Sequence, residues 1–217
     1  MKDTQKDTQK DAQSKTTIPQ QAIAYLDTLS HLMVTAQVTI SDGKQVTLDE
    51  GSETVVQWVM AVGPTSNKVM LVGNGGSSSV VSHVQNDLCK AVGVRALVFT
   101  EQPLLTALAN DIGYDAAYEQ SVQWWGDEGD LMLAVSSSGK SENILRAAQA
   151  SKDHGCKLVT FSGFGDDNPL RQMGDMNFFV DSSVYGFVET AHAALTHFIT
   201  DRAMTKMRDP AAATSGS

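Results

Sequence analysis

Five short runs of apolar residues lie along the chain, separated by segments with helical periodicity. The runs are at 68–72, 96–100, 131–135, 157–161 and 176–180. Apolar runs of this length that end in glycines or polar residues are typical of strands buried on both faces of a parallel sheet. Helical spacing is found at 20–35, 53–62, 78–91, 103–110, 116–125, 141–154 and 186–207. The pattern predicts an α/β fold, a single doubly wound five-stranded parallel sheet flanked by helices.

We expect one folded domain between two polar tails. The first tail, at 1–17, repeats the unit Lys-Asp-Thr-Gln and lacks the apolar segment of a signal peptide. The second tail lies at 209–217. Both tails are predicted to be disordered, because neither has an apolar face to bury. The domain that folds is therefore expected at 18–208.

The composition and charge exclude two classes of partner. Hydrophobic residues make up 41% of the 217 residues, and the formal net charge is -9. Such an acidic chain argues against a nucleic-acid partner, which selects a basic face. No apolar run is long enough to cross a bilayer, which argues against a membrane partner. Cys89 and Cys156 are far apart in the sequence and form no metal-ligand pair, which favours the reducing cytoplasm.

Two loops rich in glycine and serine each follow a predicted strand and open a predicted helix. They are 73–77, Gly-Asn-Gly-Gly-Ser, and 136–141, Ser-Ser-Ser-Gly-Lys-Ser. In doubly wound sheets, ligands bind at the carboxyl ends of strands near the switch in strand order. The glycine loop fits a tight turn as well as a binding loop. The serine loop favours a phosphate ligand, because a helix cap accounts for only one of its four serines.

Both loops resemble those of the sugar isomerase (SIS) domain. The stretch 73–141 is similar to the bacterial phosphoheptose isomerases, which interconvert sedoheptulose 7-phosphate and D-glycero-D-manno-heptose 7-phosphate. The similarity runs from about residue 20 to residue 207 and includes the segments 109–114 and 126–130. It implies the SIS fold and an isomerase that serves heptose synthesis for surface polysaccharide. It also implies a homotetramer with interfacial active sites, in which N-terminal helices pack in the oligomer.

The resemblance also assigns contacts to the sugar phosphate. The phosphate cradle is implied at Ser136, Ser137, Ser138 and Ser141. The glycine loop and the segment that follows the next predicted strand are implied to bind substrate through Asn74, Gly75, Gly76, Ser77, Asn110 and Asp111.

Two predicted helices carry groups suited to proton transfer. Isomerisation through an enediol needs a base for the carbon-bound proton and a group that shuttles oxygen-bound protons. His83 and Asp87 lie at i, i+4 and so share one helix face, and Glu189 and His197 lie on the last helix. From the residues alone, a surface His–Asp contact and a solvated helix face with one core histidine are favoured over a catalytic site. The resemblance implies that Asp87 is the base and His197 the acid or shuttle, with Glu189 as the second candidate for the base.

The same four residues are implied as metal ligands. His83, Asp87, Glu189 and His197 suit Zn²⁺ or another divalent ion such as Mn²⁺, Fe²⁺ or Ni²⁺. The family has glutamate in place of Asp87 and glutamine in place of Glu189. Glu189 and His197 are about 12 Å apart along one helix, so we expect one of them to come from a neighbouring subunit.

Other functions fit parts of the same pattern. One is isomerisation of a different ketose phosphate. Another is a non-catalytic SIS protein that binds a phosphosugar or a replication initiator. The presence of His83, of an acid at position 87 and of His197 favours catalysis. A regulator that senses sugar phosphates is a further alternative, and the acidic charge opposes one that binds DNA.

Overall fold

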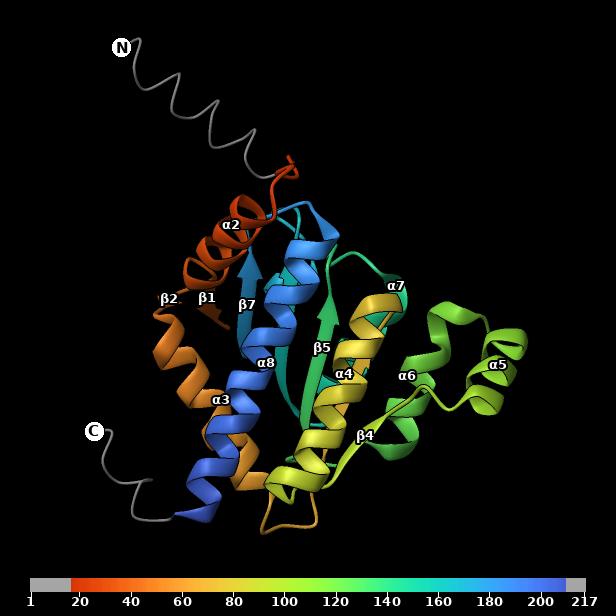
Figure 1. Ribbon diagram of the computed structural model, residues 1–217. Helices are drawn as coiled ribbons and strands as arrows, with labels where there is room; N and C mark the ends of the chain where they lie inside the picture. The colour runs from red at the N-terminus through yellow and green to blue at the C-terminus, as the bar shows by residue number, and fades with distance from the viewer. Residues whose placement is uncertain (1–16, 210–217) are drawn as a thin grey trace.

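The structure, a computed structural model, describes residues 17–209, which build one sheet covered by helices on both faces (Figure 1). The two predicted tails lie outside the described residues except for Thr17 and Asp209. The strands are β1 (Gln37–Ile40), β2 (Gln45–Val46), β3 (Val69–Gly73), β4 (Ala96–Val98), β5 (Leu131–Ser136), β6 (Lys157–Gly163) and β7 (Met176–Val180). The α-helices are α2 (Ala22–Val34), α3 (Leu48–Val62), α4 (Gly75–Asp87), α5 (Gln102–Asp111), α6 (Tyr114–Trp125), α7 (Glu142–Asp153) and α8 (Tyr185–Arg208).

The five predicted strands are all present as β3 to β7, and the neighbours among them pair in parallel. The prediction of a five-stranded, wholly parallel sheet was nevertheless wrong in the number of strands and in the direction of two strand pairings. The sheet has seven strands in the order β2-β1-β7-β6-β5-β3-β4, and β1 pairs antiparallel with both β2 and β7. A tight turn joins β1 to β2, in which Gly43 has a φ of 81° and Asp42 accepts a hydrogen bond from the Lys44 N–H.

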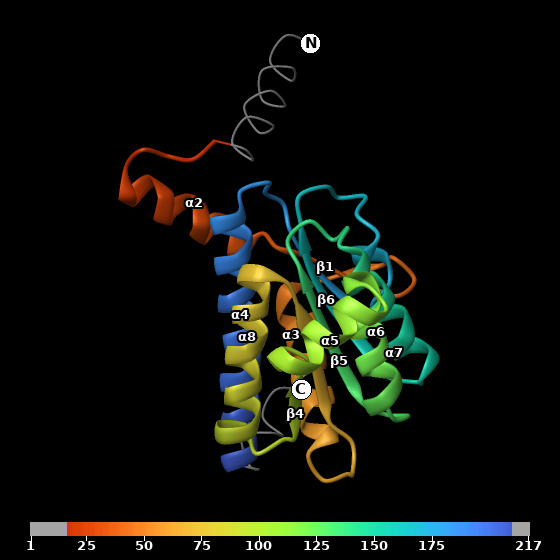
Figure 2. The same ribbon diagram turned by 90° about the vertical axis from the view of Figure 1, so that its right-hand side faces the viewer.

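The core consists of two layers, one on each face of the sheet. Alternate residues of a strand point to opposite faces. Val69 and Leu71 therefore pack with α3, α4 and α8, whereas Met70 and Val72 pack with α6 and α7. A third apolar cluster joins α2 to the first turns of α8. This arrangement leaves α4 and α8 side by side on the outer surface (Figure 2).

Several helices begin earlier than their apolar periodicity predicts. Helix α3 begins at Leu48 instead of residue 53, because Thr47 and Glu50 form a reciprocal capping box. Helix α4 begins at Gly75, so part of the glycine loop is its first turn. None of the helices within 17–209 is both long and apolar enough to cross a membrane.

The segment 126–130 has a structural role at the amino ends of the strands. Asp130 is fully buried, and its carboxylate accepts hydrogen bonds from the backbone N–H groups of Lys68 and Asp127 at 2.9 Å each. The Lys68 ammonium also lies 2.6 Å from this carboxylate. These contacts join the start of β3 to the start of β5, at the end of the sheet opposite the two Gly/Ser loops.

Candidate functional site

The two Gly/Ser loops lie next to each other because the strand order reverses between β3 and β5. These strands are parallel neighbours, with Gly73 paired to Val135, and the chain leaves them toward opposite sides of the sheet. Such a switch point opens a crevice at the carboxyl ends of the strands. Here the crevice is a cavity of about 330 Å³ lined by Asn74, Gly75, Gly76, Ser77, Ser136, Ser137, Ser138, Ser141, Tyr185 and Glu189.

Two helices direct uncapped N-termini at the cavity. Asn74 and Ser141 are the N-cap residues of α4 and α7, and both are residue types that usually cap a helix. Neither side chain makes a capping hydrogen bond, whereas Thr47 caps α3 in the ordinary way. The N-cap side chains therefore do not occupy the first-turn N–H groups of α4 and α7, which can donate to a ligand instead. Such N–H groups and the helix dipole favour an anion.

The Asn74 side chain ties the two loops together instead of capping α4. It exchanges two hydrogen bonds with Asn143 of α7, at 2.9 and 3.0 Å. Its Oδ1 also accepts a hydrogen bond from the Tyr114 hydroxyl at 2.7 Å. Tyr118, one turn later on α6, donates to the Gly73 carbonyl at 3.2 Å, and burial raises the pKa of its phenol, which keeps it a donor. These contacts fix the spacing of the two loops.

Ser137 lines the cavity, and its hydroxyl group has no hydrogen-bond partner among the described residues. The residue is 5% exposed, and its Oγ is a buried atom without a hydrogen bond. Its backbone is held in place, because its carbonyl accepts a hydrogen bond from the Gly163 N–H at 3.0 Å. An unmade hydrogen bond at a buried hydroxyl costs about 1–3 kcal/mol. A ligand oxygen in the cavity would satisfy this group.

Among residues 17–209, Glu189 is the one charged residue that lines the cavity. It lies on α8, one turn after Tyr185, and its carboxylate packs against the backbone of Gly76. A Cβ atom at position 76 would overlap that carboxylate, so the glycine is needed for this close approach. Within the described part of the chain, no lysine, arginine or histidine lines the cavity.

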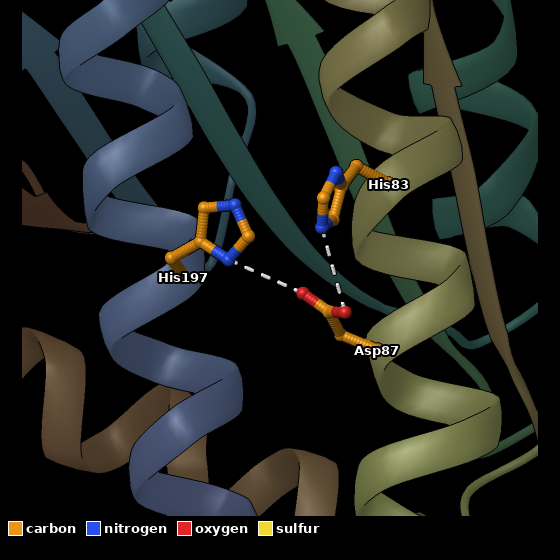
Figure 3. A group of neighbouring side chains, drawn as sticks. All are labelled: His83, Asp87 and His197. Atoms are coloured by element: carbon orange, nitrogen blue, oxygen red, sulfur yellow. Dashed lines mark ion pairs between the residues drawn. The ribbon is translucent and has the colours of Figure 1, made fainter.

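His83, Asp87 and His197 form a separate cluster between α4 and α8 (Figure 3). Asp87 Oδ1 lies 3.6 Å from His83 Nε2, and Asp87 Oδ2 lies 3.2 Å from His197 Nδ1. The two imidazole rings meet edge to face, with centroids 4.6 Å apart. The side chains of His83 and His197 are 59% and 42% exposed, so the cluster is open to solvent in one chain.

The chemistry of this donor set fits a divalent metal ion. One potential ligand atom from each residue lies within 4.8 Å of the others. Two imidazoles and one carboxylate are a set that binds zinc and leaves a fourth position open. Glu189 does not join the three, since it lines the cavity eight residues earlier on α8 than His197. The structure thus brings together three of the four predicted ligands within one chain.

Asn110 and Asp111 lie outside the cavity. They end helix α5 as exposed residues, and the Asn110 amide donates to the Asp111 carboxylate at 2.8 Å. Tyr114, three residues later, is the residue of this segment that reaches the glycine loop. Sequence reasoning did not single out Tyr114, Asn143 or Tyr185. The sequence feature that could have pointed to Tyr114 is the similarity of the segment 109–114 to the phosphoheptose isomerases.

His192 is a core residue rather than part of the cavity lining. It is completely buried, and its Nε2 lies 3.1 Å from the Ser162 carbonyl oxygen. Burial lowers the pKa of this imidazole to about 4. The ring is therefore neutral at physiological pH. Its position explains how helix α8 can carry a polar residue toward the sheet.

Comparison with known proteins gives consistent matches. The model of the SIS domain matches residues 38–163, from β1 to the end of β6. The phosphoheptose isomerase of Aliarcobacter butzleri is 27% identical over 191 residues, which cover 85% of this chain and 94% of the relative. The phosphoheptose isomerase of Helicobacter pylori (strain Shi470) is 31% identical over 140 residues, 62% of this chain and 72% of the relative.

Solved structures show the same fold. The structure of a phosphoheptose isomerase from Francisella tularensis superimposes with a TM-score of 0.72 at 21% identity, over 84% of this chain and 96% of that one. A phosphoheptose isomerase from Neisseria gonorrhoeae gives a TM-score of 0.68 at 24% identity, over 73% and 87% of the two chains. The matched residues 38–163 contain both Gly/Ser loops, which supply eight of the ten residues that line the cavity; the other two, Tyr185 and Glu189, lie on α8 after the matched range. The chain belongs to the SIS domain family.

Proposed function

We propose that this chain is an aldose–ketose isomerase that converts sedoheptulose 7-phosphate to D-glycero-D-manno-heptose 7-phosphate. The observation that carries the proposal is the cavity, where two uncapped helix N-termini and the orphan Ser137 hydroxyl surround a space that also holds the Glu189 carboxylate. These features match a phosphate site beside a candidate base. The relatives named phosphoheptose isomerase support the choice of substrate.

The serine loop is proposed to bind the phosphate. Ser136, Ser137, Ser138 and Ser141 line the cavity together with the start of α7. Hydroxyl groups and backbone N–H groups at a helix N-terminus are the donors that a phosphate accepts from. The glycine loop, whose Gly75 and Gly76 have no side chains, then lets the sugar lie against the backbone.

Glu189 is proposed as the base that takes the proton from C1 of the ketose and returns it to C2. The resemblance implied Asp87 first, but Glu189 shares the cavity with the phosphate loops, whereas Asp87 is not among the lining residues. The oxygen-bound protons must move between O1 and O2 in the same reaction. His197 remains the proposed shuttle, supplied to the cavity by a neighbouring copy of the chain.

The cluster of His83, Asp87 and His197 is proposed to hold the divalent ion. Bound there, Zn²⁺ would act as a Lewis acid that polarises a carbonyl group. Without the ion, Asp87 orients both imidazoles, since each of its oxygens faces one ring. The cluster is open to solvent on the α4 and α8 surface, which suits an interface.

We further propose a homotetramer that covers this surface. Ile23 and Leu26 of α2 are 71% and 57% exposed, and Phe198 of α8 is 48% exposed. Association that buries these apolar side chains would be favourable. It would also bring the cluster of one copy toward the cavity of another. We place the enzyme in the cytoplasm, in heptose synthesis for surface polysaccharide.

The test is incubation with sedoheptulose 7-phosphate in deuterated water, followed by NMR of the sugar. The wild-type chain should form the aldose and incorporate deuterium at the exchanging carbon. Glu189→Gln should abolish incorporation, whereas Asp87→Asn should reduce it and lower the metal content. If the wild type gives neither aldose nor deuterium, the proposed reaction is wrong, and isomerisation of a different ketose phosphate or phosphosugar binding without catalysis takes its place. If Asp87→Asn alone abolishes exchange with metal retained, Asp87 is the base.

A further inference from the structure

Tyr185 forms one wall of the cavity and, in the part of the chain that the structure describes, is the one aromatic residue that lines it. It is the first residue of α8 and is 60% exposed. Glu189 follows it by four residues, so the two side chains project from the same face of the helix. The remaining lining residues are asparagine, glycine and serine. Tyr185 therefore supplies the large apolar surface of a cavity that is otherwise polar.

Phe164 supports Tyr185 from outside the cavity. The two rings meet edge to face, with centroids 4.8 Å apart and planes at 71°. Phe164 also packs against the apolar cluster that joins α2 to α8. Such an aromatic pair restricts the positions that the exposed Tyr185 ring can take.

The backbone of Phe164 is strained. Among residues 17–209 it is the one non-glycine residue with a positive φ, at 62°. Residues with a Cβ rarely adopt this conformation, and bulky ones are true outliers. A hydrogen bond from its N–H to the Ser182 carbonyl, at 2.9 Å, holds the turn in place. A glycine would adopt this conformation freely, so backbone geometry alone does not account for a phenylalanine here.

We infer that Tyr185, supported by Phe164, is a specificity-determining residue that packs against the carbon chain of the sugar. The inference rests on the proposed function and assigns different parts of the substrate to different residues of the cavity. The serine loop contacts the phosphate, which every sugar phosphate shares. The Tyr185 ring contacts C–H groups of the sugar, which inorganic phosphate lacks. Tyr185 thus selects a phosphorylated sugar over free phosphate.

The experiment compares two ligands on purified full-length chains by isothermal titration calorimetry. One ligand is inorganic phosphate, and the other is a heptitol 7-phosphate, which has no carbonyl group and cannot isomerise. Tyr185→Ala should weaken heptitol 7-phosphate binding about tenfold, and phosphate binding should change less than about twofold. Tyr185→Phe, which keeps the ring, should bind both ligands like the wild type. Trp124→Ala, which removes an exposed aromatic residue of α6 outside the cavity, is the matched control.

Phe164→Gly tests the supporting contact. Glycine accepts the backbone conformation, so the turn should form, and retained phosphate binding would show that the site is intact. Heptitol 7-phosphate binding should fall in the same direction as in Tyr185→Ala. Equal losses for both ligands, or no loss for heptitol 7-phosphate in Tyr185→Ala, would overturn the assignment. A Tyr185→Phe variant as weak as Tyr185→Ala would overturn the role of the ring. A wild-type chain that binds neither ligand would overturn the proposed function, and this assignment with it.

Discussion

The carboxylate of Glu189 rests on the backbone of Gly76, so that a Cβ atom at position 76 would overlap it. This contact joins the first turn of α4 to the second turn of α8, two helices that are far apart in the sequence. It also sets the position of the proposed base relative to the glycine loop. The glycine is therefore tied to the carboxylate, and each residue constrains substitutions at the other.

Gly76→Ala should reduce deuterium incorporation into the sugar at least about a hundredfold, a loss of about 2.7 kcal/mol in transition-state stabilisation. The added methyl group displaces the Glu189 carboxylate, although alanine favours a helix over glycine by about 0.5–1 kcal/mol. Thermal unfolding should accordingly show no loss of stability. Glu189→Gln serves for comparison. If the two changes act through the same carboxylate, the double variant should be no worse than Glu189→Gln alone, and fully multiplied effects would contradict the contact.

Ser137→Ala should weaken phosphate binding about tenfold, or about 1.4 kcal/mol. The hydroxyl has no partner among the described residues, so its removal should leave the free energy of unfolding unchanged or slightly raised. Ser121→Ala is the matched control, because Ser121 is also buried but donates to the carbonyl of Ala117 on its own helix. Calorimetric titration with phosphate measures the effect. Equal affinities for wild type and Ser137→Ala would remove the hydroxyl from the phosphate site.

Protein purified without chelator should contain about one divalent ion per chain if the three-residue cluster is a metal site. Asp87→Asn should lose most of this metal, since the carboxylate lies between both imidazoles. Asp49→Asn, at the start of α3 and outside the cluster, should keep it. Elemental analysis measures the content directly. Metal retained in Asp87→Asn, or absent from the wild type after reconstitution, would contradict the assignment.

The stability of the fold should fall as the pH drops from about 6.5 to about 4, through the titration of His192. Its pKa is lowered to about 4 by burial in the folded chain, against 6.5 when unfolded, so the unfolded chain binds the proton first. The stability contribution is therefore present above the unfolded pKa and lost as the pH falls toward the folded one. The loss amounts to about 3 kcal/mol. NMR of the His192 ring should show a neutral imidazole at pH 5, and a protonated ring there would refute the prediction.

The sequence predicted the parallel part of the sheet because strands buried on both faces are continuous apolar runs. It did not predict β1 and β2, which have four and two residues and show no such run. The Asp42–Gly43 pair was a local sign of the turn between them. Helix starts were missed where a capping box or a glycine, instead of an apolar residue, begins the helix.

The sequence identified most residues of the candidate site, but it did not predict how these residues contact one another. The two Gly/Ser loops could be placed together because their strands end at the same side of a doubly wound sheet. The use of Asn74 could not be predicted, since its partners Asn143 and Tyr114 are 69 and 40 residues away. The spacing of Glu189 and His197 indicated that one helix could bring both to one ion only at near full extension of the side chains.

The edge strands on both sides of the sheet are short, and this limits how copies of the chain can associate. The outermost strands are β2, with two residues, and β4, with three. Strands this short have few unpaired backbone N–H and C=O groups with which a strand of another chain could form hydrogen bonds. Growth by continuous strand pairing, the route to fibres, is therefore disfavoured at both edges of the sheet. The proposed homotetramer would therefore form through helix surfaces, where contacts between side chains can close an assembly at a defined number of copies.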